Sequence, residues 1–307
     1  MEKRDTRNRP PLAGVLPVFQ TPYHQDESID FDTLAKELDW LHEQGANGVV
    51  MAMVSEVLRL SSEEREQLAD FVCHHAADRG NVIISTGAES SHLAERLSRH
   101  AAEAGADALM AIPPVATVLD DDQLLNYYER ILEAVEIPVI VQDASGYVGR
   151  PMSIALQARL LERYPERVLF KPEAAPLGPR LSALRDATAG QARIFEGSGG
   201  MALVDSYRRG VVGTMPGGEV VDAIVALWKA LEAGDDQRAY QISLPLSALV
   251  AVQSGLDGYL AVEKHLLVRR GLFKNTIVRG PVGYSLDEET RREVDRLFDQ
   301  LMLAISA

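Results

Sequence analysis

The sequence is poor in cysteine, in basic residues and in long apolar runs. Its single cysteine, Cys73, excludes an intrachain disulfide and any metal cluster built from several cysteines. No apolar run approaches the length of a membrane span, and the charged segment 1–11 lacks the apolar stretch of a signal peptide. Lys and Arg total 31 against 45 Asp and Glu, and the net charge of -14 disfavours binding to nucleic acid. We therefore expect a cytoplasmic enzyme with no membrane and no nucleic-acid partner.

What the sequence does contain is a repeated alternation of short apolar runs and amphipathic segments. The 307 residues are 46% hydrophobic and 25% charged, which is typical of a globular protein with a large core. Capping residues such as Ser61 and Ser90 precede the amphipathic segments, and glycines such as Gly45 and Gly105 follow them. We predict strands at 15–20, 48–53, 82–86, 108–112, 139–143, 168–171, 193–196 and 211–215, and helices at 32–44, 62–77, 91–104, 121–135, 153–164, 177–187, 201–208 and 220–233.

Eight strand–helix units with continuous apolar strands predict a parallel α/β sheet that is buried on both faces. Eight is the number that closes a (β/α)₈ TIM barrel. The main alternative is an open doubly wound sheet, but no Gly-x-Gly-x-x-Gly pattern follows the first strand. Further helices are expected at about 236–253, 256–270 and 287–305. The predicted organisation is a single domain with an N-terminal tail at 1–11, a barrel at 12–234, and C-terminal helices at 235–307 that pack on the barrel.

Lys171 ends the strand predicted at 168–171 and is followed by Pro172, which is expected to stop that strand. In a barrel of this kind the chemistry lies at the carboxyl ends of the strands, so Lys171 would point into the barrel mouth. A neutral amine there could form a Schiff base with a 2-keto acid. The alternative is a surface lysine that happens to follow a strand.

A set of short motifs in a fixed order resembles the dihydrodipicolinate synthase / N-acetylneuraminate lyase superfamily, from about residue 12 to residue 301. The motifs are Gly14 to Thr21-Pro22, Ile29-Asp30, Gly45 and Gly48, Ser55-Glu56 to Leu60-Ser61, Glu64-Arg65, Gly105-Ala106-Asp107, Pro113-Pro114, Pro138-Val139-Ile140, Phe170-Lys171, and Gly210 to Gly213. The resemblance implies a class I lyase of 2-keto acids on a (β/α)₈ barrel. It also implies an imine on Lys171 in place of any metal or organic cofactor, and a homotetramer built as a dimer of dimers.

The chain departs from this superfamily at several site positions. The usual Gly-Thr-Thr-Gly-Glu after the second strand is Ala52 to Glu56 here, which leaves Ser55 and nearby backbone amides to hold a substrate carboxylate. Gln142-Asp143 stands where relatives have Tyr-Asn, so the proton-shuttling tyrosine is missing. Tyr147 aligns with the arginine that binds the second substrate in dihydrodipicolinate synthases.

These losses argue against dihydrodipicolinate synthesis. The segment 141–144, the pair Ser55-Glu56 and the run Phe170-Lys171-Pro172-Glu173 resemble L-2-keto-3-deoxyarabonate dehydratases instead. That match is partial, because an aromatic residue is expected near Val115.

Each remaining candidate has a catalytic and a structural interpretation. Glu173 is a candidate base for proton transfer, or else an ion-pair partner of Arg180. Gln142 does not titrate, but it can hydrogen-bond a substrate hydroxyl or hold a water. Asp143 can contact substrate, or it can serve as a cap or salt-bridge partner. Glu56 is expected to pair within its own loop.

Other candidates come from the ends of the last two strands and from the strand-two loop. Gly197 lets backbone amides approach a ligand, although a tight turn would need glycine equally. Met215 aligns with a position whose backbone approaches the keto acid, and Gly217 could bind hydroxyls through its backbone. Ser55 is a carboxylate donor or a turn serine, and Tyr147 could reach into the site.

The sequence therefore predicts a Schiff-base lyase that dehydrates a 2-keto-3-deoxy sugar acid similar to L-2-keto-3-deoxyarabonate. The first alternative is a pyruvate-dependent aldolase or a dihydrodipicolinate synthase-like enzyme. An alternative of another class is a non-catalytic barrel that binds keto acids. The expected partner in every case is a small 2-keto acid.

Overall fold

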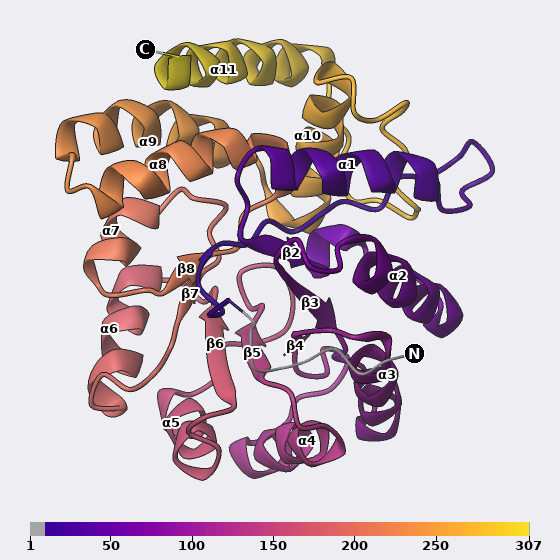
Figure 1. Cartoon of the computed structure of the whole chain (residues 1–307), viewed down its shortest axis with the longest axis vertical. Coiled ribbons are helices and arrows are strands. Elements are labelled where there is room, and N and C mark those ends of the chain that lie inside the picture. Colours follow the sequence, from indigo (N-terminus) through magenta and orange to yellow (C-terminus); the bar gives the residue numbers. More distant parts are fainter. Residues whose placement is uncertain (1–9, 307) are drawn as a thin grey trace.

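The computed structural model describes residues 10–306, in which eight short strands alternate with helices. The strands form a ring in the middle of the molecule, and the helices surround it (Figure 1). In chain order the strands are β1 (Gly14–Val15), β2 (Gly48–Val50), β3 (Asn81–Ser85), β4 (Ala108–Ala111), β5 (Val139–Asp143), β6 (Val168–Pro172), β7 (Phe195–Glu196) and β8 (Gly213–Thr214).

Parallel pairing closes the strands into a barrel. One ladder runs from β2 to β6 in sequence order, and a second joins β1, β8 and β7. Single parallel bridges fill both gaps, because Val18 pairs with Val50 and with Gly217, and Phe170 pairs with Ile194. Every strand therefore has two neighbours, and the predicted (β/α)₈ TIM barrel is confirmed.

Alternate residues along each strand face opposite sides of the barrel wall. Leu169 packs in the inner cluster of apolar side chains, whereas Phe170 packs in the outer cluster between strands and helices. Lys171 follows with the inward parity of Leu169. On β5, Ile140 is inward, so Gln142 points inward and Asp143 outward.

The prediction that Pro172 stops the strand before it is wrong by one residue. β6 includes Pro172, which pairs with Asp143, and Lys171 is the penultimate residue opposite Gln142. Proline has no N–H to donate to the hydrogen bonds between strands, and this is tolerated here because Pro172 is the last residue of β6.

Five of the eight barrel helices, α1 to α5, begin where the sequence places a capping side chain. Asp30, Ser61, Ser90, Asp120 and Ser153 each accept a hydrogen bond from the backbone N–H three residues on. The helices are α1 (Phe31–Glu43), α2 (Ser62–His75), α3 (Ser91–Ala104), α4 (Asp121–Ala134), α5 (Ile154–Arg163), α6 (Leu177–Ala187), α7 (Leu203–Arg208) and α8 (Val221–Glu232).

Three helices follow the barrel and gather on the side of α1 and α8 (Figure 1). They are α9 (Asp236–Ala251), α10 (Gly255–Arg269) and α11 (Glu288–Ser306). α9 packs against α8 and α11, while α10 contacts the short 3-10 turns η2 (Met53–Ser55) and η3 (Gly218–Val220). Because η2 follows β2 and η3 follows β8, α10 lies at the carboxyl ends of the strands.

Of the tail expected at 1–11, residues 1–9 lie outside the described part of the chain. The Pro11 carbonyl accepts a hydrogen bond from Asn81 Nδ2 at 3.2 Å, at the start of β3. Within residues 10–306, no helix combines the length and the apolar character needed to cross a membrane.

Candidate active site

A small cavity of about 30 Å³, here called the inner cavity, lies at the carboxyl ends of the strands. β6 contributes Lys171 and the following Glu173, and the loop after β5 contributes Tyr147. The ends of β7 and β8 contribute Gly197 and Met215. A cavity of this size has room for about one water molecule, so a keto acid has to displace side chains to enter.

Lys171 and Glu173 form a buried ion pair in this cavity. Lys171 Nζ lies 3.1 Å from Glu173 Oε1, and the two side chains are 5% and 4% exposed. Gln142 Nε2 donates to the other carboxylate oxygen, Oε2, at 2.6 Å. Burial raises the pKa of Glu173, and the positive charge of Lys171 and the amide of Gln142 oppose that rise.

The alternative interpretation of Glu173 as a partner of Arg180 is wrong. Arg180 Nη2 instead donates to the Met152 carbonyl at 2.5 Å and lies 3.5 Å from Asp143 Oδ2. Among the described side chains, the Glu173 carboxylate therefore pairs with Lys171 and accepts a hydrogen bond from Gln142, and Arg180 does not compete for it.

Gly197 is required by space around the ion pair. A Cβ atom at this position would lie 2.8 Å from Lys171 Cε and 2.7 Å from Glu173 Cγ, both closer than van der Waals contact allows. Its φ is not positive, so the backbone angle alone does not demand glycine.

Tyr147 does reach the inner cavity. Its hydroxyl lies 3.5 Å from the Gly197 carbonyl, and its ring packs edge-on against Tyr259 with centroids 5.4 Å apart. Burial, followed by the charge of Glu173, raises the pKa of Tyr147 well above its usual range. The phenol therefore stays protonated and serves as a hydrogen-bond donor.

Ser55 does not offer its hydroxyl to the cavity, contrary to the sequence prediction. Ser55 Oγ donates to the Phe19 carbonyl at 2.6 Å and accepts from the Ala52 N–H at 3.1 Å, which makes it a turn serine. On this side of the inner cavity Met53 and Val54 line the wall instead.

Glu56 and Asp143 also have structural partners in place of a substrate. Glu56 Oε1 accepts from Lys264 Nζ at 2.5 Å, in an ion pair with α10 and not within its own loop as expected. Asp143 points outward and accepts from the Met152 N–H at 2.9 Å, thereby shaping the loop that carries Tyr147.

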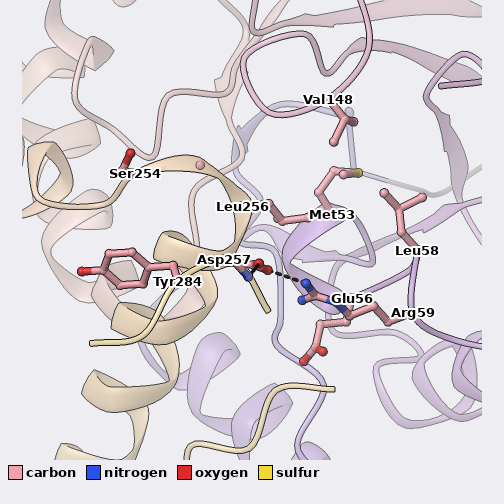
Figure 2. A pocket seen from close by; sticks show the side chains of 11 residues that line it. Met53, Glu56, Leu58, Arg59, Val148, Ser254, Leu256, Asp257 and Tyr284 are labelled. Atoms are coloured by element: carbon pink, nitrogen blue, oxygen red, sulfur yellow. Dashed lines mark hydrogen bonds and ion pairs between the residues drawn. The ribbon is translucent and has the colours of Figure 1, made fainter. Parts of the chain in front are cut away.

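A second, larger pocket opens outside the inner cavity and is shown in Figure 2. This outer pocket has a volume of about 490 Å³, and Met53 lines both it and the inner cavity. An ion pair between Arg59 and Asp257 bridges the loop after β2 and the start of α10 (Figure 2). Met53 is thus the side chain that stands between the two spaces.

Two cavity residues, Tyr259 and Glu263, were missed at the sequence level because they belong to α10. They are four residues apart and so share one face of the helix. The available signal was the adjacent pair Glu263-Lys264 in an otherwise apolar stretch, since charged residues are rarely fully buried without a reason.

The family model described as "Dihydrodipicolinate synthetase family" matches residues 11–301. The chain belongs to this family. Members of the dihydrodipicolinate synthetase family are lyases, and the lysine, the barrel and the cavity at its mouth agree with that class.

Relatives in the family include both dehydratases and synthases. The chain is 29% identical to L-2-keto-3-deoxyarabonate dehydratase from Azospirillum brasilense, over 96% of this chain and 97% of the relative. Dihydrodipicolinate synthase from Rhodopseudomonas palustris superimposes with a TM-score of 0.84 at 28% identity, covering 94% and 97% of the two chains. Chloride-inhibited dihydrodipicolinate synthase from Acinetobacter baumannii, solved with pyruvate, superimposes with a TM-score of 0.83 at 25% identity. The match covers 94% of this chain and 98% of that structure.

Proposed function

We propose that this family member dehydrates a 2-keto-3-deoxy sugar acid through a Schiff base on Lys171. The observation that carries the proposal is the chain of contacts from Lys171 through Glu173 to Gln142, buried at the mouth of the barrel. It supplies a nucleophilic amine and a carboxylate base, both within reach of one small molecule.

The first step is imine formation. Lys171 Nζ, with its proton passed to Glu173 at 3.1 Å, attacks the C2 carbonyl of the keto acid. The carbinolamine hydroxyl then takes that proton back from Glu173 and leaves as water, which gives a protonated imine and restores the Glu173 carboxylate. Because the Ser55 hydroxyl is committed to Phe19, we assign the substrate carboxylate to backbone amides beside Met53 and Val54.

The second step is proton removal at C3. The imine withdraws electrons from C2 and makes the C3 proton acidic, and the Glu173 carboxylate takes that proton. The electron pair of the C3–H bond forms the enamine, which then expels the C4 hydroxyl. The imine is the electron sink of this scheme, so the scheme needs neither a metal nor an organic cofactor.

Gln142 favours dehydration over carbon–carbon cleavage. Retro-aldol cleavage needs a base for the C4 hydroxyl, and the residue opposite Lys171 is an amide that does not titrate. The similarity to L-2-keto-3-deoxyarabonate dehydratase supports the same choice of reaction and of substrate class.

Aldol cleavage is the second candidate, because Tyr147 lines the inner cavity and brings a phenol near the reacting carbons. Condensation in the manner of a dihydrodipicolinate synthase, and keto-acid binding without chemistry, are the remaining outcomes of the same test. The homotetramer implied by the family resemblance stays a prediction, which light scattering of the purified protein would test.

The decisive experiment supplies purified protein with L-2-keto-3-deoxyarabonate and related 2-keto-3-deoxy acids. Semialdehyde formation and pyruvate release are followed in parallel. We expect the semialdehyde as the main product. Pyruvate as the main product would establish the aldolase, and efficient condensation of pyruvate with aspartate semialdehyde would overturn both readings. A protein that binds pyruvate and turns over none of these acids would be a non-catalytic barrel.

A further inference from the structure

Three buried carboxyl groups gather beside the inner cavity, and one of them, Glu263, lines it. They belong to Glu37 of α1, Glu219 of η3 and Glu263 of α10, and all are at most 2% exposed. A Cβ atom on Gly217 would lie 2.4 Å from Glu219 Oε2 and 2.5 Å from Glu263 Oε1. These two oxygens are therefore at most about 5 Å apart, a separation at which one charge disfavours a second.

Glu263 is the member of this trio that borders the inner cavity together with Lys171. Gln20 Nε2 donates to Glu263 Oε2 at 2.6 Å, which fixes the carboxyl plane and leaves Oε1 toward Gly217. In the described part of the chain no basic side chain forms an ion pair with Glu219 or Glu263. Residues 10–306 also contain no group of three His, Cys, Asp or Glu side chains arranged to hold a metal ion, so the trio is not a metal site.

Burial raises the pKa of every carboxyl group in the trio. Burial and the charge of Glu219 raise the pKa of Glu263 well above its usual range. Burial likewise raises the pKa of Glu219 to about 7 and that of Glu37 well above its usual range. Several other groups face this cluster from the elements around it. Lys171, Tyr147 and Tyr259 face Glu263, and Arg270 and Asp222 face Glu219.

Glu173 and Glu263, which both line the inner cavity, therefore differ in their protonation state. Glu173 forms a close ion pair with Lys171 at 3.1 Å and serves as the base, whereas Glu263 has no ion-pair partner among the described residues, lies beside the Glu219 carboxyl group and keeps its proton. Two carboxyl groups with opposite surroundings in one site are the arrangement expected of a general base and a general acid.

We propose that Glu263 is the general acid that protonates the C4 hydroxyl as it leaves, and that Glu219 is a positioning residue that keeps the proton on Glu263. The proposal rests on the dehydration proposed above. When the enamine forms the C3–C4 double bond, the C4–O bond breaks and the oxygen takes the Glu263 proton to leave as water. The nitrogen lone pair re-forms the C2=N bond of the protonated imine, the C4–O electron pair leaves with the oxygen, and Glu263 is left as a carboxylate.

The proton balance closes within the same site. In a five-carbon substrate the double bond next moves from C3–C4 to C4–C5. This step removes a proton from C5, and the Glu263 carboxylate accepts that proton. Glu173 returns its proton to C3, and the resulting enol becomes the aldehyde in water. Both carboxyl groups are then in their starting states, and water hydrolyses the imine to release product.

Tyr147 is the competing acid, since its phenol is protonated in the same cavity. A phenol whose pKa is raised further by burial is a much weaker acid than a carboxylic acid, so it transfers a proton to a leaving hydroxyl less readily. Gln142 cannot compete, because an amide has no proton to give near neutral pH.

The test separates acid catalysis from the steps before it. Three assays are run on each variant: deuterium uptake into the methyl group of pyruvate, dehydration of a 2-keto-3-deoxy acid, and elimination of chloride from 4-chloro-2-oxobutanoate. The first needs the imine and the base. The third needs both but no acid, because chloride leaves without a proton. Only the second needs all three.

We expect Glu263→Gln to lose dehydration by about 100-fold or more while keeping deuterium uptake and chloride elimination within about twofold of the wild type. Glu173→Gln should lose all three activities. Glu95→Gln, a change at a partly buried residue of α3 that pairs with Arg130, is the matched control and should alter none. Dehydration by Glu263→Gln within about threefold of wild type would overturn the proposal, as would equal loss of all three activities in a folded protein. Loss of dehydration in Tyr147→Phe but not in Glu263→Gln would assign the acid to the phenol.

A second variant tests the role of Glu219 by pH. Removing this carboxylate by Glu219→Gln should let Glu263 lose its proton at lower pH, so the alkaline limb of the dehydration rate should move to lower pH. The pH profile of chloride elimination should not move. An unmoved dehydration profile would overturn the positioning role. A wild-type protein that exchanges deuterium but dehydrates no keto acid would instead overturn the proposed function, which keeps the two failures distinct.

Discussion

Gln142 and Lys171 stand directly opposite each other on the paired strands β5 and β6, and both bind the same carboxylate, that of Glu173. One strand register therefore sets the positions of the proposed nucleophile Lys171, of the proposed base Glu173 and of Gln142, which holds the Glu173 carboxylate. A shift of one residue would turn all the inward side chains of a strand to the outside.

Borohydride reduction in the presence of pyruvate should add one pyruvate-derived mass per chain, located on Lys171. Lys171→Ala should not be labelled, and Lys171→Arg should be equally inactive, because a permanently charged guanidinium cannot form the imine. Mass spectrometry of the intact chain and of its peptides is the measurement. Equal labelling of wild type and Lys171→Ala would contradict the assignment.

Replacing Gln142 by leucine should raise the pH at which Glu173 loses its proton and can act as a base. The Gln142 amide stabilises the ionised carboxylate and so lowers the pKa of Glu173. Without it that pKa rises, and the acidic limb of the rate of deuterium uptake into pyruvate should move to higher pH. Gln157→Leu, a buried change on α5 away from the cavity, is the matched control. An unmoved limb in Gln142→Leu would show that the contact does not tune the base.

Gly197→Ala should lower the catalytic rate strongly, with a smaller effect on folding. The added methyl group would lie within 2.8 Å of both Lys171 Cε and Glu173 Cγ, and would force the ion pair apart. We expect activity to fall by about 100-fold, because misplacement of reacting groups by about 1 Å has that effect. Gly258→Ala, where the nearest atom to a new Cβ is 3.6 Å away, is the control. Turnover and urea denaturation measure the two effects, and an active Gly197→Ala would contradict the geometry.

Introducing a phenol opposite Lys171 by Gln142→Tyr should raise pyruvate release relative to semialdehyde formation. A phenol there can take the C4 hydroxyl proton that cleavage requires, whereas the amide cannot. Val115 lies where the resemblance predicts an aromatic residue, so we expect a change of product ratio and not a complete switch. The two products are measured in one reaction. A ratio identical to that of wild type would contradict this account of Gln142.

Breaking the buried pair of Glu56 and Lys264 should destabilise the protein strongly. Both side chains are 0% exposed, so Lys264→Met would leave the Glu56 carboxylate buried and unpaired. Loss of one partner of such a pair costs about 3–5 kcal/mol of the free energy of unfolding. The double variant Lys264→Met with Glu56→Gln should lose less free energy of unfolding than the sum of the losses in the two single variants. Urea denaturation of the four proteins measures this coupling, and additive losses would contradict it.

The sequence predicts local features well. The observed bounds of α3, α6 and β5 match the predicted ranges residue for residue. The Ser90 cap defines the start of α3 and an apolar run defines β5, and both features are local in the sequence. β1, β7 and β8 are shorter than predicted, because strand length in a barrel depends on where the neighbouring strands offer partners.

The site was harder to predict, because it depends on which side a residue faces and on distant partners. Ser55 has the right chemistry for a carboxylate donor, but its hydroxyl is taken by Phe19, 36 residues earlier in the chain. Asp143 follows Gln142 and therefore points to the opposite side of the strand. Glu263 follows the end of β8 by almost fifty residues, and only the packing of α10 brings it to Lys171.

The position of α10 has a consequence for the order in which the chain becomes active. Synthesis from the N-terminus completes β6, which carries Lys171, and the following Glu173 well before α10 emerges. Until α10 docks, a barrel with its reactive amine in place lacks Tyr259, Glu263 and the Lys264 partner of Glu56. Under the proposed mechanism, turnover is thus a property of the finished chain, and a barrel truncated before residue 255 would carry the proposed nucleophile without the proposed acid.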